Sequence, residues 1–152
     1  MRSVLFVCAA NICRSPLAMG LLWGKVGPEL NKWRIQSAGI WAEDGRPPAQ
    51  NTQLVLKERG IDISDYRSRQ LTEEMLESYN LVLTMERGQK EALRAAFPEY
   101  ASRIFLLTEM VCKYYDVVDP VGRSMMDFEH TAQEIEQILS EGFELIQTLA
   151  KS

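Results

Sequence analysis

Residues 3–16 read SVLFVCAANICRSP. The first six of them, 3–8, form a continuous apolar and β-branched run, which predicts a strand buried on both faces. Ser15 and Pro16 are typical of a helix start, with Ser15 as the N-cap and Pro16 at the first helical position, where no N–H is needed. A short loop would therefore lead from a buried strand into a helix N-terminus. In open α/β sheets, ligands bind at this place.

The rest of the chain continues the same alternation of strands and helices. Further strands are predicted at 81–83 and 104–107, and an alternating stretch at 33–38 suits the edge of a sheet. Helical patterns are predicted at 16–26, 49–59, 72–78, 87–96 and 125–150. Thr72 and Ser124 are the expected N-caps of the third and fifth of these helices. The pattern predicts right-handed βαβ units around a parallel sheet, in one α/β domain over residues 1–152.

Composition limits the classes of function. The chain has 152 residues, 46% apolar and 25% charged, with a net charge of −4, so no global field recruits nucleic acid or an anionic membrane. No segment approaches the ~20 apolar residues that span a bilayer. Three cysteines suit a reducing compartment, and we expect a cytoplasmic protein. His130 is the only histidine and no cysteine pair has zinc-ligand spacing, so we expect no metal.

The loop after the first strand carries the predicted chemistry. Such a loop aims backbone N–H groups inward and adds the helix dipole, so it binds dianions. Arg14 adds a planar fork that can hold two phosphate oxygens. The same field should ionise the Cys8 thiol, and Ser15 can donate to its sulfur. The alternative is a buried Cys8 without chemistry and an exposed Arg14; the strand before and the helix start after favour the anion site.

Residues 8–16 resemble the signature of the low-molecular-weight protein-tyrosine phosphatases. Ser37-Ala38-Gly39, Arg69-Gln70-Leu71 and Asp119-Pro120 are also similar to that family, so the resemblance runs nearly end to end. It implies a four-stranded parallel sheet with helices on both faces, a phosphate-binding loop after the first strand, and neither metal nor cofactor.

The resemblance also implies a role for each matching residue. Cys8 would attack phosphorus, and Arg14 would hold the equatorial oxygens. Asn11 would brace the loop, and Asp119 would be the general acid. The phosphate would be bound by Ala9, Ala10, Asn11, Ile12, Cys13, Arg14 and Ser15.

The residues alone do not decide which aspartate is the general acid. An Asp before Pro is more often a turn residue, although Pro120 holds Asp119 extended and rigid. Asp116 and Asp127 are nearby alternatives, and only the resemblance selects Asp119.

Cys13 also has two interpretations. It could intercept oxidised Cys8 as a disulfide, since the loop must curl, or it could fill a small apolar gap. The resemblance, in which a paired cysteine recurs, favours redox protection.

Several positions depart from the family pattern. Ala10 stands where the family usually has Gly, which is tolerable only if its φ is negative, and Ala9 replaces a larger residue. Val121 replaces an aromatic residue, and Tyr66 replaces a histidine that helps to brace the loop asparagine. Trp41 and Val121 are candidate pocket walls, with a core position as the alternative for Trp41. These changes affect substrate preference and rate more than reaction type.

The function expected is hydrolysis of phosphotyrosine esters through a phosphocysteine on Cys8. The partner would be a phosphotyrosine protein, with a tyrosine kinase as one candidate, and inorganic phosphate would be the product.

Other functions on the same scaffold are alternatives. Arginine phosphatases that resemble this family carry Thr at the position of Ile12, so the apolar Ile12 favours phosphotyrosine as the substrate. Arsenate reduction would need a thiol relay, and Cys112 lies in an apolar stretch where burial is expected. A phosphotyrosine-binding module would lack Cys8 or Asp119, and a nucleotide binder would show a glycine-rich motif.

Overall fold

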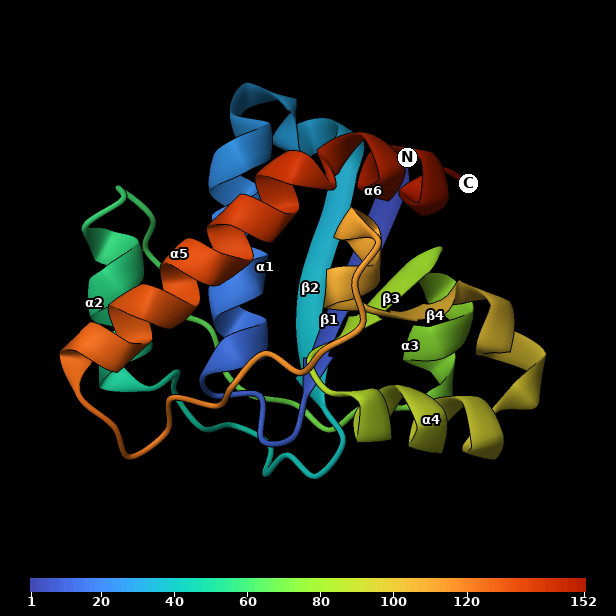
Figure 1. Ribbon diagram of the computed structural model, residues 1–152, viewed down its shortest axis with the longest axis horizontal. Helices are drawn as coiled ribbons and strands as arrows, with labels where there is room; N and C mark the ends of the chain where they lie inside the picture. Colours follow the sequence, from blue (N-terminus) through green and yellow to red (C-terminus); the bar gives the residue numbers. More distant parts are fainter.

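A four-stranded parallel sheet lies at the centre of the computed structural model, which describes all residues 1–152 (Figure 1). Its strands are β1 (Arg2–Cys8), β2 (Trp33–Gly39), β3 (Leu81–Thr84) and β4 (Ile104–Leu106). Their order is β2-β1-β3-β4, and every neighbouring pair is parallel. The predicted α/β fold with four parallel strands is confirmed, including the edge position of the strand at 33–39.

Helices connect the strands. They are α1 (Arg14–Val26), α2 (Gln50–Lys57), α3 (Glu73–Ser78), α4 (Arg87–Ala96), α5 (Met125–Glu141) and α6 (Phe143–Ala150). Three short 3₁₀ helices are η1 (Gly27–Lys32), η2 (Pro98–Arg103) and η3 (Leu107–Val111). None of the helices is both long enough and apolar enough to traverse a bilayer.

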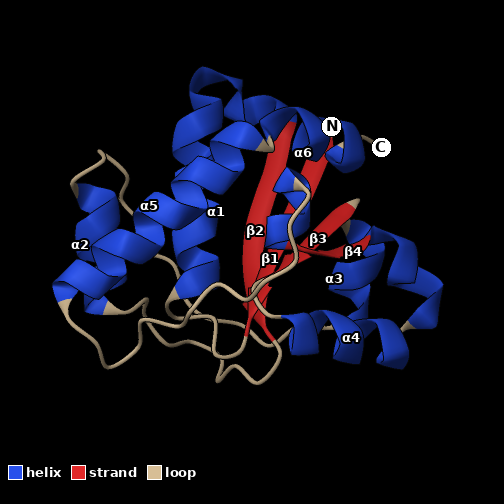
Figure 2. Cartoon of the chain, in the orientation of Figure 1, coloured by secondary structure: helices blue, strands red, loops and turns tan.

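Both faces of the sheet are covered, as predicted (Figure 2). Alternate residues of β1 point to opposite faces. Val4 and Phe6 pack in the larger core, with α1, α5 and α6. Leu5 and Val7 pack in a smaller core with side chains of α3 and α4. β1 is therefore buried on both sides, which explains its uninterrupted apolar sequence.

Two of the expected helix caps are present. The Thr72 hydroxyl accepts a hydrogen bond from the Met75 N–H at the start of α3. Ser124 and Asp127 form a reciprocal capping box at the start of α5. Both caps satisfy N–H groups that have no partner within the helix.

The predicted N-cap of α1 is wrong. The helix begins at Arg14, and its N-cap residue Cys13 makes no side-chain cap hydrogen bond. The Ser15 hydroxyl instead lies 3.0 Å from the Cys8 sulfur, because the loop curls back over the end of β1. Ser15 thus serves the site rather than the helix end.

The single helix expected at 125–150 is two helices, which meet at Gly142 (Figure 1). A Cβ atom at Gly142 would lie 2.7 Å from the Met110 carbonyl oxygen and 2.8 Å from the Met110 Cβ. The glycine therefore permits η3 to pack directly on the junction between α5 and α6. The sequence indicated only a weaker helix there, because it does not show which segment packs against it.

Candidate active site

The site lies at the carboxyl end of β1, with β2 on one side and β3 on the other. The chain leaves β1 towards one edge of the sheet and later returns to the other edge, so the connections diverge at this point. Such a switch point leaves an opening between them, where ligands bind in α/β folds. Cys8 is the last residue of β1 and is buried.

The loop after Cys8 presents unused backbone donors. None of the N–H groups of residues 10–15 donates to a backbone carbonyl, although Asn11, Cys13 and Arg14 are buried. Asn11 has a left-handed backbone, with φ of 61°, which asparagine tolerates better than most residues. Ala10 has no positive φ, as its methyl group requires. Buried donors of this kind need an acceptor, and an anion at a helix N-terminus supplies several acceptor atoms.

Gly39 allows the loop to approach β2. The N–H groups of Ile40 and Trp41 donate to the carbonyls of Cys8 and Ala9, at 3.0 and 2.9 Å. A Cβ atom on Gly39 would lie 2.7 Å from the Ala9 carbonyl oxygen. The glycine of the Ser37-Ala38-Gly39 stretch is therefore a steric requirement of the loop.

Asn11 connects the loop to the Cys8 sulfur. Its Nδ2 donates to the Ser15 Oγ at 2.8 Å and to the Ser37 Oγ at 2.9 Å. The Ser15 Oγ lies 3.0 Å from the Cys8 Sγ. Because Asn11 already donates to the Ser15 oxygen, the Ser15 hydrogen is left for one of two acceptors, the sulfur at 3.0 Å or the Ala38 carbonyl at 3.5 Å. An anionic sulfur is the better acceptor for that hydrogen.

Tyr66 occupies the bracing position. Its hydroxyl lies 2.8 Å from the Asn11 Oδ1 and 2.6 Å from the Ser37 Oγ, which donates to it. Burial raises the pKa of Tyr66, so its hydroxyl stays protonated and can donate. The tyrosine hydroxyl thus holds the loop asparagine in place.

Arg14 lies under the loop and is 2% exposed, which removes the alternative of a surface charge. Its Nη1 is 2.6 Å from a Glu86 carboxylate oxygen and donates to the Val117 carbonyl at 2.8 Å. Its Nη2 is 3.6 Å from Asp119, and its Nε has no partner. The guanidinium is therefore held through its Nη1, whereas its edge with the free Nε is available to bind an anion.

The sequence did not single out Glu86. It follows β3 at the same edge of the sheet as Cys8 and forms part of a capping box at the start of α4. A charged residue two positions after the end of a parallel strand was the available signal.

The three candidate acids have different surroundings. Asp119 is half-exposed and lines a small pocket of about 60 Å³ with Cys8 and Arg14. Asp116 instead accepts hydrogen bonds from the Arg87 N–H and Nε, and the backbone bond is the main cause that lowers the pKa of Asp116. Asp127 belongs to the α5 capping box. Of the three, only Asp119 lines the pocket.

The pocket is otherwise mostly apolar. Its remaining lining residues are Ala10, Ile12, Cys13 and Val121. Trp41 is not among them and is 81% exposed, on the turn that follows β2. Its role as a pocket wall stays a prediction, whereas Val121 does line the pocket.

The other two cysteines lie in contrasting environments. Cys13 is buried and lines the pocket beside Cys8. Burial is the main cause that raises the pKa of Cys13 to about 12, with the charges of Asp119 and Cys8 adding to it and Arg14 opposing it. Cys112 is exposed, contrary to expectation, and ends η3 with a left-handed backbone.

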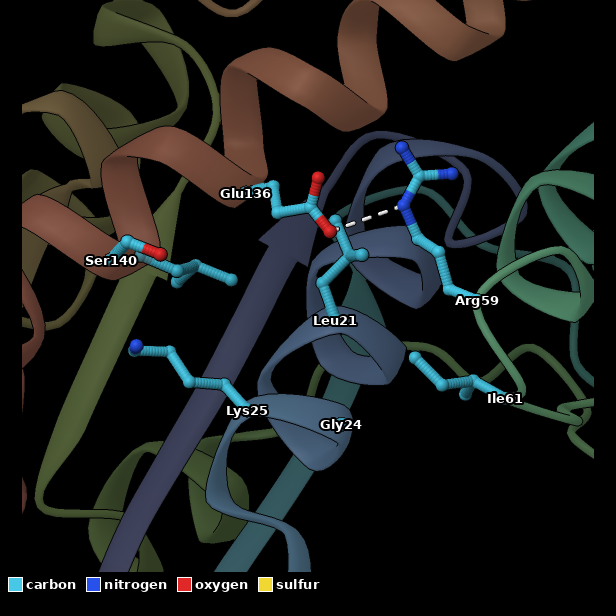
Figure 3. Close-up of a pocket in the computed structure, with 8 residues that line it drawn as sticks. Leu21, Gly24, Lys25, Arg59, Ile61, Glu136 and Ser140 are labelled. Atoms are coloured by element: carbon cyan, nitrogen blue, oxygen red, sulfur yellow. Dashed lines mark hydrogen bonds and ion pairs between the residues drawn. The ribbon is translucent and has the colours of Figure 1, made fainter.

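A larger hollow of about 310 Å³ lies elsewhere, between α1, α5 and the segment after α2 (Figure 3). Arg59 lies in its wall and is paired with Glu136 and Glu129. The hollow has no cysteine in its lining. Nor does the structure contain a cluster of three His, Cys, Asp or Glu side chains placed as metal ligands.

Comparison with known proteins gives a consistent result. The family model for low molecular weight phosphotyrosine protein phosphatase matches residues 3–152. The probable low molecular weight protein-tyrosine-phosphatase EpsP of Ralstonia solanacearum is 36% identical, over 90% of each chain. The low molecular weight protein tyrosine phosphatase of T. tengcongensis is 40% identical, with a TM-score of 0.90 over 95% of this chain and 99% of that one.

A third relative has a different substrate. It is the YwlE arginine phosphatase, whose cysteine-to-serine mutant has been solved with a phosphorylated active-site serine. That structure is 32% identical, with a TM-score of 0.88 over 99% of this chain and 97% of that one. The match over the whole domain, together with a buried cysteine at the start of a loop whose N–H groups have no backbone acceptor, shows that the chain belongs to the low molecular weight phosphotyrosine protein phosphatase family.

Proposed function

We propose that this protein hydrolyses phosphotyrosine in proteins, with Cys8 as nucleophile, Arg14 as phosphate ligand and Asp119 as general acid and base. One observation carries the proposal: the N–H groups of the loop at residues 10–15 have no backbone acceptor. This loop lies beside Cys8 and includes Arg14, whose Nε has no hydrogen-bond partner. A phosphoryl group is the anion whose three terminal oxygens suit these donors.

The reaction would proceed in two steps. The Cys8 thiolate attacks phosphorus, the bond from phosphorus to the phenolic oxygen breaks, and Asp119 donates its proton to the leaving phenolate. Water then attacks the phosphocysteine while the Asp119 carboxylate takes the water proton. The phosphorus–sulfur bond breaks, which releases inorganic phosphate and restores the thiolate. Throughout, Arg14 and the loop N–H groups stabilise the charge on the oxygens.

The apolar lining favours tyrosine over arginine. Ile12 and Val121 can contact the flat faces of a phenyl ring, whose burial is favourable. A phosphoarginine guanidino group carries several N–H donors, and neither side chain can accept a hydrogen bond from them. Because a relative is an arginine phosphatase, arginine remains the second candidate, and the carboxylate of Asp119 is the acceptor that would favour it.

The proposal includes a phosphoprotein as partner, of which a tyrosine kinase is one candidate, and a location in the cytoplasm. Three free cysteines support a reducing compartment, because an oxidising one would cross-link or oxidise the exposed Cys112.

Trapping of the intermediate tests the mechanism. Rapid acid quench of the wild-type enzyme with ³²P-labelled phosphotyrosine peptide should place the label on Cys8. Cys8→Ser should lose at least roughly 10³-fold in turnover, as expected when a nucleophile is removed. Cys112→Ser, an exposed cysteine outside the pocket, is the control and should retain wild-type turnover. Wild-type activity in Cys8→Ser would contradict the proposal.

A substrate panel tests which phosphorylated side chain is the substrate. Wild-type enzyme should have a higher kcat/KM for phosphotyrosine than for phosphoarginine in the same peptide, and Ile12→Thr should narrow that difference. A preference of the wild type for phosphoarginine would replace the first candidate by the second.

A further inference from the structure

Arg69 is bound to the loop network from an adjacent segment. Its main-chain N–H donates to the Asn11 Oδ1 at 3.0 Å, and its Nε donates to the Ser37 carbonyl at 3.0 Å. Its own carbonyl accepts from the Gly39 N–H, which fixes the segment along the end of β2. The Nη2 atom of Arg69 is buried and has no hydrogen-bond partner.

No carboxylate neutralises Arg69. None of the ion pairs in the structure includes it, whereas the Arg14 guanidinium faces both Glu86 and Asp119. The positive charge of Arg14 is thus opposed by two carboxylates, before any phosphate is bound. Arg69 is the arginine of the network whose charge remains uncompensated.

A chain of hydrogen bonds connects the Arg69 guanidinium with Cys8. The Tyr66 hydroxyl has one hydrogen and two acceptors at 2.8 Å, the Ser37 carbonyl and the Asn11 Oδ1. Both oxygens already accept a hydrogen bond from Arg69, the Asn11 Oδ1 from its main-chain N–H and the Ser37 carbonyl from its charged Nε. The bond from the charged Nε is the stronger of the two, so the Ser37 carbonyl is the weaker acceptor for a further hydrogen, and the Tyr66 hydrogen is directed to Asn11. The hydrogen bond to the Asn11 Oδ1 polarises the amide group and makes its Nδ2–H groups stronger donors. The Nδ2 atom donates to the Ser15 hydroxyl.

We propose that Arg69 is a positioning residue, whose uncompensated guanidinium orients the Tyr66–Asn11–Ser15 hydrogen bonds towards Cys8 and thereby stabilises the anionic sulfur. The role rests on the proposed function, in which Cys8 acts as a thiolate. Arg69 itself contacts neither the sulfur nor the pocket, so it acts through Ser37 and Asn11.

Other ionisable groups also surround the sulfur. Cys13 and Arg14 lie on the loop and the start of α1, and Asp119 lies in the segment after η3. The charges of both Arg69 and Cys8 act on the Tyr66 hydroxyl. All of these groups are unchanged when only Arg69 is substituted, so a shift in Cys8 reactivity reports on Arg69.

The experiment measures Cys8 ionisation without turnover. The rate of Cys8 alkylation by iodoacetamide, a neutral reagent, is followed from pH 4 to pH 9 by mass spectrometry, with peptide fragmentation to separate Cys8 from Cys13. The variants are Arg69→Met, Arg69→Gln and Arg69→Lys. Arg67→Met is the matched control, since exposed Arg67 donates only to the Ser64 and Tyr66 carbonyls.

The pH midpoint of Cys8 alkylation should rise by roughly one pH unit in Arg69→Met and Arg69→Gln, a size typical of a lost opposite charge. It should stay within a few tenths of a unit of wild type in Arg69→Lys, which keeps the charge, and in Arg67→Met. Equal midpoints in Arg69→Gln, Arg69→Lys and wild type would overturn the proposal, and that comparison decides the question even if Arg69→Met does not fold. A protein that shows the shift but no phosphatase activity would refute the proposed function and not the role of Arg69.

Discussion

Single residues of the site owe their chemistry to their surroundings, and Cys13 is an example. Its thiol, with a pKa raised to about 12 mainly by burial, is protonated at neutral pH. A protonated thiol is a weak nucleophile, so Cys13 does not compete with Cys8 for phosphorus. The predicted reaction of Cys13 with an oxidised Cys8 is supported by one observation, that the two side chains line the same pocket.

Peroxide treatment tests this redox role. A Cys8 sulfenic acid and the Cys13 thiol would form a disulfide and release water. Because the attacking species is the thiolate and its pKa lies well above neutral, disulfide formation should become faster by about tenfold per pH unit between pH 6 and pH 8. The measurement is peptide mapping of the Cys8–Cys13 linkage after a peroxide pulse, with recovery of activity in dithiothreitol.

Cys13→Ser provides the comparison. It should lose activity irreversibly under the same pulse, while wild type recovers. Equal recovery in both proteins, with no linkage in the wild type, would reduce Cys13 to a packing residue.

The choice of acid is a second question at this scale. Asp119→Asn should lower turnover most for aryl phosphates with basic leaving groups, by about 10²-fold or more, because those groups need the proton. Asp116→Asn should show little dependence on the leaving group, since Asp116 is bonded to Arg87. The measurement is a plot of log kcat against leaving-group pKa. A steep slope in Asp116→Asn together with a flat one in Asp119→Asn would assign the acid to Asp116.

At the scale of elements, the junction of α5 and α6 depends on close backbone contact. Gly142 ends α5 where η3 crosses, and η3 leads into the segment that carries Asp119. The Val117 N–H donates to the Met85 carbonyl, so this segment is also attached to the end of β3. Packing at the junction therefore supports the segment that carries Asp119 without contact with the pocket.

Gly142→Ala tests the junction. Its methyl group would meet the Met110 backbone, so we expect a loss of about 1–3 kcal/mol in the free energy of unfolding, as for other overpacked sites. Gly88→Ala is the matched control: it lies in α4 with no atom within 4 Å of an added Cβ, and should stabilise the protein by about 0.5–1 kcal/mol. Urea unfolding of both variants gives the comparison. Equal stability of Gly142→Ala and wild type would show that η3 can move aside.

At the scale of the whole molecule, helices distant in sequence are joined over one face of the sheet. Arg59, just after α2, pairs with Glu129 at 2.6 Å and with Glu136 at 3.1 Å, both on α5 (Figure 3 shows the pair with Glu136). The hydrogen bond from Arg59 is the main cause that lowers the pKa of Glu129 below its usual 4.5. A lowered carboxyl pKa stabilises the fold above the unfolded value, and that stabilisation is lost as pH falls below about 4.5.

Arg59→Met should therefore destabilise the protein at pH 7, by roughly 1 kcal/mol for partly exposed ion pairs. The difference from wild type should shrink as the pH falls below 4.5, because Glu129 becomes protonated in both proteins. Urea midpoints at pH 7 and pH 3.5 measure this. Lys32→Met, which breaks only an exposed pair with Glu29, is the control and should match wild type at both pH values. A pH-independent difference in Arg59→Met would point to lost packing of its side chain rather than lost charge.

The sequence predicted the fold and the centre of the site because these depend on neighbouring residues. The apolar run at 3–8 and the pattern of residues 8–16 predicted a buried strand, a loop and a helix in succession, and all three are present. The local sequence also predicted the helix N-caps Thr72 and Ser124, and both caps are present. Of the two predictions for Ser15, the helix N-cap is wrong, whereas the contact of its hydroxyl with the Cys8 sulfur is present at 3.0 Å. Only the curl of the loop decides between these two partners.

Only the tertiary structure decided which distant groups serve the loop. Arg14 is buried because it meets the Val117 carbonyl, 103 residues further along the chain, and Glu86. Asn11 is held by Tyr66 and Arg69, which no local pattern connects with it. The sequence determined the strand, the loop and the nucleophile, since hydrophobic periodicity and backbone propensity act over a few residues. The partners of that nucleophile were decided by the packing of parallel strands, whose carboxyl ends bring remote segments to one edge of the sheet.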